Sequence, residues 1–136
     1  MLFRSRVVEV CAQAQASFGA GSDEVVQAAN FNDPGQTVIS GSKLAVDQAC
    51  EKLKAAGAKR TLLLPVSAPF HCPLMQPAAE RLRAHLADLV LQPPTIAVIN
   101  NIDVAQETDP ARIRDALFRQ AYGPVRWVEK IGRAHV

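Results

Sequence analysis

The chain has 136 residues, of which 49% are hydrophobic and 21% are charged, and its formal net charge is +2. This size and apolar content are typical of one globular domain with a hydrophobic core, and they exclude a fibrous or disordered chain. No run approaches the roughly 18 consecutive apolar residues of a membrane span and no leader opens the chain, so we expect a cytoplasmic protein that does not bind membranes.

The two ends of the chain need separate treatment. MLFRS at 1–5 and IGRAHV at 131–136 match translations of the two strands of a common sequencing adapter, so we expect both ends to be adapter-derived. Without Arg4 and Arg133 the chain has 13 basic and 13 acidic residues, and its mild basicity then gives no indication of nucleic-acid binding. We expect residues 6–130 to be an internal piece of a longer protein.

The first half of the chain predicts a helix, a hairpin and a second helix. Residues 7–16 are rich in Ala, Glu and Gln, which favour a helix, and GAGSD follows as a break. Two β-branched runs at 24–32 and 36–41, separated by the turn sequence NDPG, predict antiparallel strands. A second helix is expected from Ser42, a possible N-cap, to Gly57. Its expected apolar stripe consists of Leu44, Val46, Ala49, Cys50, Leu53 and Ala56.

The remaining elements complete an α/β pattern. RTLLLPVS at 60–67 predicts a buried strand, which gives a split β-α-β arrangement without its first strand. Asp109 followed by Pro110 is a good helix start. The second half is expected to contain, in order, a helix at 73–91, an apolar strand at 93–101 and helices at 109–121 and 125–130.

One histidine in the stretch LLLPVSAPFHCPLM has an unusual setting. His71 is either a satisfied structural residue or a general base, and residue type alone favours the first. Pro65, Pro69 and Pro73 restrict the backbone around it, and the loop follows a predicted strand, where α/β proteins commonly place ligand-contacting residues. Because a general base must be held within hydrogen-bond reach of its proton partner, a stiff loop favours the functional interpretation.

Other chemistry is disfavoured. A nucleophilic pair of Cys72 with His71 is unfavourable because adjacent side chains usually diverge and no local basic group would lower the thiol pKa. His85, beside Arg81 and Arg83, is expected to be solvated, and no third ligand is spaced to complete a metal site with the two histidines. The three cysteines are far apart and outside any C-x-x-C motif, so reduced thiols are expected.

Three stretches carry a resemblance to a known family. NFNDPGQTVISG, LPVSAPFHCPLMQPAAERL and VINNIDV…IRDALFRQAYGPVRW, in this order and spacing, resemble the malonyl-CoA:acyl carrier protein transacylases and the acyltransferase domains of polyketide synthases. The resemblance covers nearly all of residues 6–130. It implies an α/β-hydrolase-like large subdomain with an inserted ferredoxin-like subdomain. Residues 6–67 would be the incomplete insert, and residues 68–130 part of the large subdomain.

The resemblance also implies site residues. His71 matches the family's catalytic base, and Gln120 matches the position whose backbone carbonyl orients the imidazole. Phe70 is implied to shape the acyl pocket in favour of malonyl over methyl-branched units. Asn32 matches a cleft-lining asparagine, although a turn residue of the Asx type before Asp33 is an equally good interpretation.

The resemblance implies a role in fatty acid synthesis. In the implied reaction, a serine ester carries the malonyl group from malonyl-CoA to acyl carrier protein. The enzyme is implied to bind no cofactor or metal. The sequence lacks the family's G-H-S-x-G nucleophile elbow and the arginine that pairs with the malonyl carboxylate. We therefore expect this chain to be a fragment that is inactive alone. The alternative is a noncatalytic binding or regulatory module with a ferredoxin-like fold.

Overall fold

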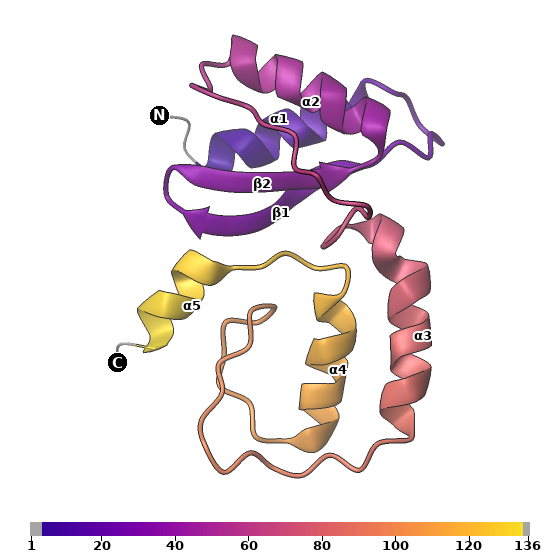
Figure 1. The fold of residues 1–136 in the computed structure, drawn as a ribbon, viewed down its shortest axis with the longest axis vertical. Coiled ribbons are helices and arrows are strands. Elements are labelled where there is room, and N and C mark those ends of the chain that lie inside the picture. The colour runs from indigo at the N-terminus through magenta and orange to yellow at the C-terminus, as the bar shows by residue number, and fades with distance from the viewer. Residues whose placement is uncertain (1–3, 135–136) are drawn as a thin grey trace.

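The computed structural model of the protein describes residues 4–134. We divide the chain drawn in Figure 1 by sequence into the N-terminal unit (residues 4–58) and the C-terminal unit (residues 59–134). The first holds α1 (Arg4–Ala16), β1 (Val26–Asp33), β2 (Gln36–Gly41) and α2 (Lys43–Ala55), and the second η1 (Pro73–Met75), α3 (Gln76–Ala87), α4 (Pro110–Gln120) and α5 (Trp127–Ala134). The predicted α/β class is confirmed.

The N-terminal unit is a hairpin covered by two helices. Strands β1 and β2 pair antiparallel from Val26 opposite Gly41 to Asp33 opposite Gln36, as the NDPG turn predicted. The register shifts twice, so Ala29 and Asn32 on β1 have no partner on β2 and form bulges. Helices α1 and α2 pack against each other and lie on the same side of the hairpin (Figure 1).

The main core of the protein lies inside this unit. Apolar side chains that recur every three or four residues on α1 and α2 meet the inner face of β1. The buried members are Val7, Val10, Cys11, Ala14, Val26, Ala45, Ala49 and Leu53. The core of this unit is therefore formed entirely by contacts within residues 4–58.

Helix α2 confirms its predicted start and end but corrects its predicted stripe. Ser42 occupies the N-cap position, yet its hydroxyl hydrogen-bonds Glu24 instead of capping the helix. Gly57 ends the helix with a φ of 98°. Leu44, expected in the core, is 63% exposed, because the buried stripe follows Ala45 at intervals of four residues and Leu44 lies about 100° away from it.

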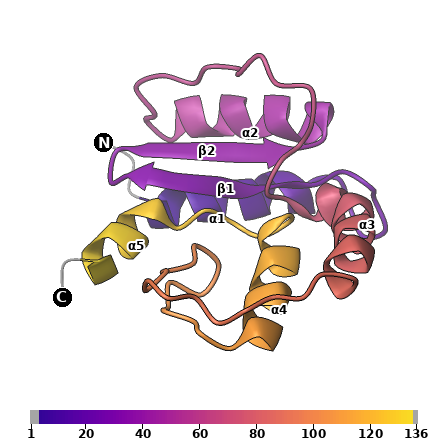
Figure 2. The ribbon, with the colours of Figure 1, turned by 60° about the horizontal axis from the view of Figure 1, so that its bottom comes forward.

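The predicted strand at 60–67 is wrong. The segment is an irregular loop between α2 and α3 (Figure 2), and Leu62, Leu63, Leu64 and Val66 are all more than half exposed. A strand requires a neighbour that accepts its ladder of hydrogen bonds. Within residues 4–134 the only sheet is the two-stranded hairpin, so this apolar run has no strand beside it.

The free edge of β1 is used by a different segment. Val125 donates its N–H to the carbonyl of Ala29 at 2.7 Å, and the N–H of Phe31 donates to the carbonyl of Val125 at 2.9 Å. These two bonds form a parallel bridge between Asn30 and Val125. The residues between α4 and α5 therefore join the C-terminal unit to the hairpin.

The predicted strand at 93–101 is also wrong. Only one bridge forms there, between Ile99 and Gln106, and it closes a short loop rather than a sheet. Ile96 is 78% exposed. As for the segment at 60–67, an apolar run alone does not form a strand when no neighbouring strand is present.

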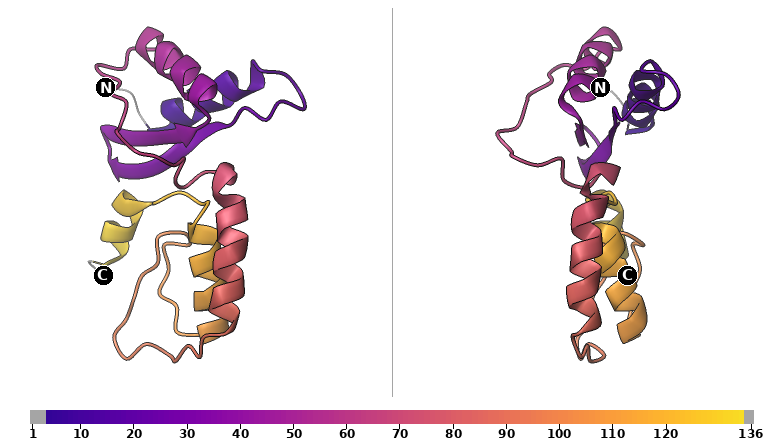
Figure 3. Two further views of the ribbon diagram at one scale, coloured as in Figure 1. Left: turned by 45° about the vertical axis from the view of Figure 1, so that its right-hand side comes forward. Right: turned by 90° about the vertical axis from the view of Figure 1, so that its right-hand side faces the viewer.

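Helices α3 and α4 lie side by side (Figure 3). The guanidinium of Arg114, on α4, donates to the carbonyl of Leu86 at 2.9 Å and to that of Leu89 at 2.8 Å. These contacts satisfy carbonyls at the end of α3, which ends at Ala87 rather than at the predicted residue 91.

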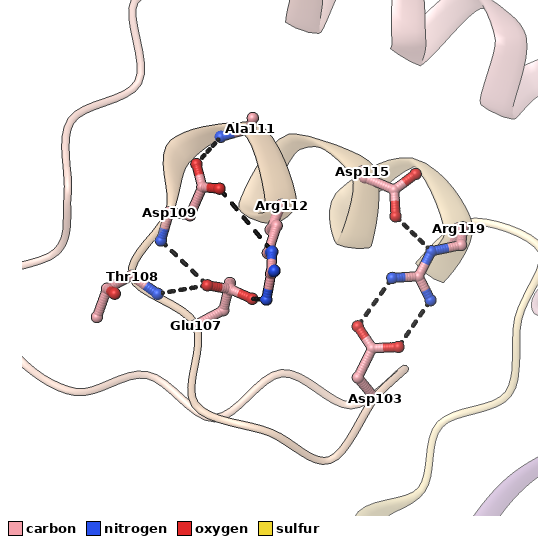
Figure 4. A network of polar contacts seen from close by, with 8 residues as sticks. All are labelled: Asp103, Glu107, Thr108, Asp109, Ala111, Arg112, Asp115 and Arg119. Atoms are coloured by element: carbon pink, nitrogen blue, oxygen red, sulfur yellow. Dashed lines mark hydrogen bonds and ion pairs between the residues drawn. The ribbon is translucent and has the colours of Figure 1, made fainter.

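The start of α4 confirms the predicted cap. The Asp109 carboxylate accepts the N–H of Ala111 at 2.9 Å, and Pro110 is the first helical residue. Glu107 accepts the N–H groups of Thr108 and Asp109 just before the helix, as Figure 4 shows. Local polar contacts thus fix where α4 begins.

Helix α5 extends beyond the predicted 125–130 and reaches Ala134. Arg4 of α1 forms an ion pair with Glu129 of α5, so helical residues at both ends of the described chain are in contact. The adapter origin of residues 1–5 and 131–136 concerns the coding sequence and stays a prediction. None of the helices in residues 4–134 is long and apolar enough to cross a membrane.

Candidate active site

The loop that carries His71 is held in an uncommon conformation. His71 has a φ of 60°, in the left-handed region, where a residue other than glycine costs about 1–3 kcal/mol unless its surroundings hold it. The Cys72 thiol donates to the carbonyl of Pro69 at 3.2 Å, and Cys72 is fully buried. The N–H of Phe70 donates to the carbonyl of Ala68 at 3.0 Å. These contacts and the flanking prolines keep the loop stiff.

The imidazole of His71 contacts the end of α4. Its Nδ1 lies 3.1 Å from the backbone carbonyl oxygen of Gln120, 49 residues further along the chain. A carbonyl oxygen can only accept a hydrogen bond, so Nδ1 must carry the proton for this contact to form. In the neutral ring Nε2 then has a free lone pair and can accept a proton. The structure thus brings two of the predicted site residues together.

The Gln120 carbonyl is itself fixed by the turn that follows α4. The Gln120 side-chain amide donates to the carbonyls of Gly123 at 3.2 Å and Pro124 at 3.3 Å. A Cβ on Gly123 would lie 2.2 Å from the Ile102 side chain and 2.8 Å from the backbone oxygen of Arg119. Only glycine fits this turn, which directs the end of α4 toward His71.

An ion pair beside Gln120 ties α4 to the loop before it. Arg119 donates to both carboxylate oxygens of Asp103 at 2.8 Å and to Asp115 at 2.7 Å (Figure 4). Hydrogen bonding from Arg119 lowers the pKa of Asp103, and the same bonds raise the pKa of Arg119. Val104, next to Asp103, is buried with a φ of 54°. The bidentate pair therefore holds a strained loop against the helix.

A contact from the N-terminal unit reaches the same histidine from the other side. The side-chain amide of Gln27, on β1, donates to the backbone carbonyl of His71 at 2.9 Å. Gln27 and His71 are 44 residues apart. The histidine loop therefore has one anchor in each unit.

The other predicted site residues lie apart from this contact. Phe70 is adjacent to His71 and 49% exposed, so its ring is available to a ligand. Asn32 is an exposed bulge residue near the end of β1, roughly 16 Å along the strand from Gln27 at a rise of about 3.3 Å per residue. The turn of the Asx type is made by Asp33, which accepts the N–H of Gly35 at 2.8 Å. A role of Asn32 in the cleft stays a prediction.

The side chains of the other candidate reactive groups take no part in the contact between His71 and Gln120. His85 is exposed on α3, and Cys72 has its thiol directed to a carbonyl. All three cysteines are free, and burial raises the pKa of Cys11 to about 11, which keeps that thiol protonated. Among residues 4–134 no three His, Cys, Asp or Glu side chains gather into a possible metal site.

Several residues that shape the site were not predicted. Gln27 bonds His71, and Gly123 fits the turn that follows Gln120. The pair of Asp103 with Arg119 ties the helix that ends at Gln120 to a distant loop. Gly123 had a local signal, because a Gly-Pro pair just after a helix is typical of a helix end. Nothing in the sequence around Gln27 indicated its partner.

Comparison with known proteins shows the family. The acyl transferase domain family matches residues 6–134. The chain belongs to this family. The malonyl CoA-acyl carrier protein transacylase of Salmonella typhimurium is 52% identical over 118 residues, which make up 87% of this chain and 38% of that relative. The chain therefore spans less than half the length of the relative that it matches.

Solved structures agree with this assignment. The acyl-carrier-protein S-malonyltransferase of Burkholderia pseudomallei is 51% identical and superposes with a TM-score of 0.92 over 99% of this chain and 42% of its own. A malonyl-transacylase in complex with the acyl carrier protein of a type II polyketide synthase is 42% identical, with a TM-score of 0.90 over 97% of this chain and 41% of its own. The division of this chain into hydrolase-like and ferredoxin-like subdomains stays a prediction.

Proposed function

We propose that this chain is part of a malonyl-CoA:acyl carrier protein transacylase and supplies its general base, His71. The observation that carries the proposal is the contact of His71 Nδ1 with the Gln120 carbonyl. This contact selects the tautomer in which Nε2 can accept a proton, the state that a general base needs. The 52% identity to the Salmonella typhimurium transacylase supports the choice of reaction.

In the first half-reaction, a serine hydroxyl attacks the thioester carbonyl of malonyl-CoA while Nε2 of His71 takes the hydroxyl proton. The tetrahedral intermediate then collapses, the carbon–sulfur bond breaks, and the imidazolium returns the proton to the leaving thiolate of coenzyme A. A malonyl ester remains on the serine. The Gln120 carbonyl stabilises the imidazolium less than a carboxylate would, because it carries only a partial charge.

The second half-reaction reverses the roles of the groups. His71 accepts the proton of the phosphopantetheine thiol of acyl carrier protein, and the sulfur attacks the malonyl ester. The serine oxygen then leaves with the proton from the imidazolium. No redox step occurs and no metal or cofactor is required.

The serine belongs, in this proposal, to the remainder of a longer protein. Within residues 4–134 no serine hydroxyl is hydrogen-bonded to His71. The apolar runs at 62–66 and 96–98 are exposed and unpaired, as expected of segments that pack against further strands. We therefore expect the chain alone to transfer no malonyl group and to form no malonyl ester.

Two further residues are proposed to line the substrate-binding cleft. Phe70 immediately precedes the base and is half-exposed, so its ring can limit the space beside the reacting carbon. Asn32 is proposed to line the wider cleft on the basis of the NFNDPGQ motif. Malonyl-CoA and acyl carrier protein are the substrates, and fatty acid synthesis is the proposed process.

The test uses a hybrid enzyme, in which residues 6–130 replace the structurally matching stretch of the Burkholderia pseudomallei enzyme. His71→Ala in the hybrid should slow malonyl transfer by at least the ~10²–10⁴-fold that a general base contributes. The loss can be larger, because nucleophile and base act as a unit. Transfer is followed as formation of malonylated carrier protein by mass spectrometry.

His85→Ala is the matched control, because His85 is exposed on the helix that follows the loop. It should leave the rate within about twofold of the parent hybrid. An equal effect of the two variants would refute the role of His71 and would favour the noncatalytic module. The isolated chain, incubated with malonyl-CoA, should gain no mass, and a malonyl ester on any of its residues would contradict the proposed division of roles.

A further inference from the structure

The backbone of His71 requires an external restraint. Its φ of 60° lies outside the regions that most residues prefer, so an unrestrained loop would relax toward negative φ. Relaxation would rotate the Cα–Cβ bond and carry the imidazole away from the Gln120 carbonyl. The contacts of Phe70 and Cys72 stiffen the flanking backbone, but the carbonyl of His71 itself is bound by Gln27.

Gln27 is well placed to act as this restraint. Its neighbours on β1, Val26 and Ala28, are buried, so the strand that carries it is fixed by the core of the N-terminal unit. Successive side chains of a strand point to opposite faces, and Gln27 therefore points away from the face of Val26. Its amide Nε2 reaches the His71 carbonyl at 2.9 Å and is half-buried, where a hydrogen bond competes less with water.

The two glutamines act on the two ends of the same residue. The Gln120 carbonyl accepts from the ring, and the Gln27 amide donates to the main chain. Because the carbonyl and the Cβ of His71 are attached through the same Cα, fixing the direction of one restricts the direction of the other. A residue of the N-terminal unit thus sets the orientation of an imidazole in the C-terminal unit.

We propose that Gln27 is a positioning residue that holds His71 in its left-handed conformation and so directs Nε2 toward the nucleophile. This inference rests on the proposed function of His71 as general base. Gln27 makes no contact with the reacting groups in this scheme and acts only through the histidine.

The test removes the amide donor of Gln27 and keeps a side chain of similar length. In the hybrid enzyme, Gln27→Met should lower kcat by roughly 10- to 100-fold, since misplacement of a catalytic group by about 1 Å can cost ~10² in rate. The KM for malonyl-CoA should change less than twofold, because the histidine contributes in the transition state rather than to substrate binding. Gln27→Glu, which is isosteric but has no amide donor, should behave in the same way and provides a second variant if the first fails to fold.

Gln13→Met is the matched control. Gln13 is an exposed glutamine on α1 whose amide contacts only Glu9 in the same helix, so kcat should stay within about twofold of the parent. A similar loss of kcat in Gln13→Met would show that any change of glutamine to methionine has this effect. That result would overturn the inference.

The double variant separates positioning from a general structural effect. If Gln27 acts through His71, Gln27→Met should cause no further loss in a His71→Ala background. A further loss of the same size there would overturn the inference, and so would an unchanged kcat in the single variant while His71→Ala remains strongly impaired. An unimpaired His71→Ala would refute the proposed function and this inference together.

Discussion

The N-terminal and C-terminal units differ in how they use their apolar residues. In the N-terminal unit, α1, α2 and the hairpin enclose one core, and few large apolar side chains are exposed. In the C-terminal unit, α3 and α4 pack side by side, while most of the protein's exposed large apolar side chains lie on the surrounding segments. The N-terminal unit buries its apolar side chains against nearby parts of the chain, whereas the C-terminal unit leaves many of its apolar side chains exposed.

The difference follows from sequence separation. A hairpin and two helices that flank it bury their apolar faces against each other over short loops. Segments 60–67 and 93–101 have strand-like composition, but strand pairing depends on a neighbour that no local contact provides. The site lies where the units meet, because the His71 loop is bound by β1 on one side and by α4 on the other.

The comparison is tested most strongly by truncating one leucine in each unit. Leu53 is 6% exposed in the core, and Leu63 is 70% exposed in the loop after α2. In the isolated chain, Leu53→Ala should lower the free energy of unfolding by about 2–5 kcal/mol, the usual cost of a buried Leu→Ala change. Leu63→Ala should stay within about 0.5 kcal/mol. Urea unfolding followed by circular dichroism measures both.

The same two variants, Leu53→Ala and Leu63→Ala, can also be compared in the hybrid enzyme. If the remainder of a longer protein covers the loop, Leu63→Ala should become destabilising there by at least ~2 kcal/mol while the cost at Leu53 stays the same. A silent Leu63→Ala in the hybrid would show that the loop is exposed in the complete enzyme as well, and the interpretation of the C-terminal unit would be wrong.

A smaller effect is expected from the side chain next to the base. If Phe70 excludes an α-methyl group, Phe70→Ser in the hybrid should shift the ratio of kcat/KM values toward methylmalonyl-CoA by about 1–3 kcal/mol, the usual value of one methyl group in a pocket. Competition between the two thioesters measures this ratio. Leu74→Ser, on η1 and similarly exposed, should leave it unchanged. An unaltered ratio in Phe70→Ser would remove Phe70 from the selectivity of the enzyme.

The smallest effect concerns the ion pair beside Gln120. Arg119 lowers the pKa of Asp103, so the pair stabilises the folded state above the ordinary carboxyl pKa near 3.8, and this contribution is lost as the pH falls through the lower folded value. Because the pair is partly exposed, its full value is only about 0–1 kcal/mol. Asp103→Asn should therefore destabilise the protein slightly at pH 6 and by less at pH 2.

Thermal unfolding at the two pH values measures this difference. Asp88→Asn is the control, since Asp88 is exposed and takes part in none of the ion pairs formed by residues 4–134. An Asp103→Asn variant that is equally destabilised at both pH values would show that the side chain acts through packing rather than charge.

The local elements could be predicted because their signals are short-range. Alanine-rich 7–16, the NDPG turn and Asp109 before Pro110 each specify a structure through neighbours within a few residues, and all three are found as expected. The motif around His71 indicated the family, and the match over residues 6–134 confirms it. The contact between His71 and Gln120 was expected from that resemblance, because a motif preserves long-range geometry that periodicity does not encode.

By itself, the sequence determined the helices, the hairpin and the family, since each depends on local propensity or on a long linear motif. Only the tertiary structure decided that the leucines at 62–64 are exposed, that His71 takes a left-handed backbone, and that Gln27 binds its carbonyl. These features depend on which distant segments meet. A strand needs a neighbour, and a strained residue needs a partner to hold it, and neither requirement is visible in the residues on either side.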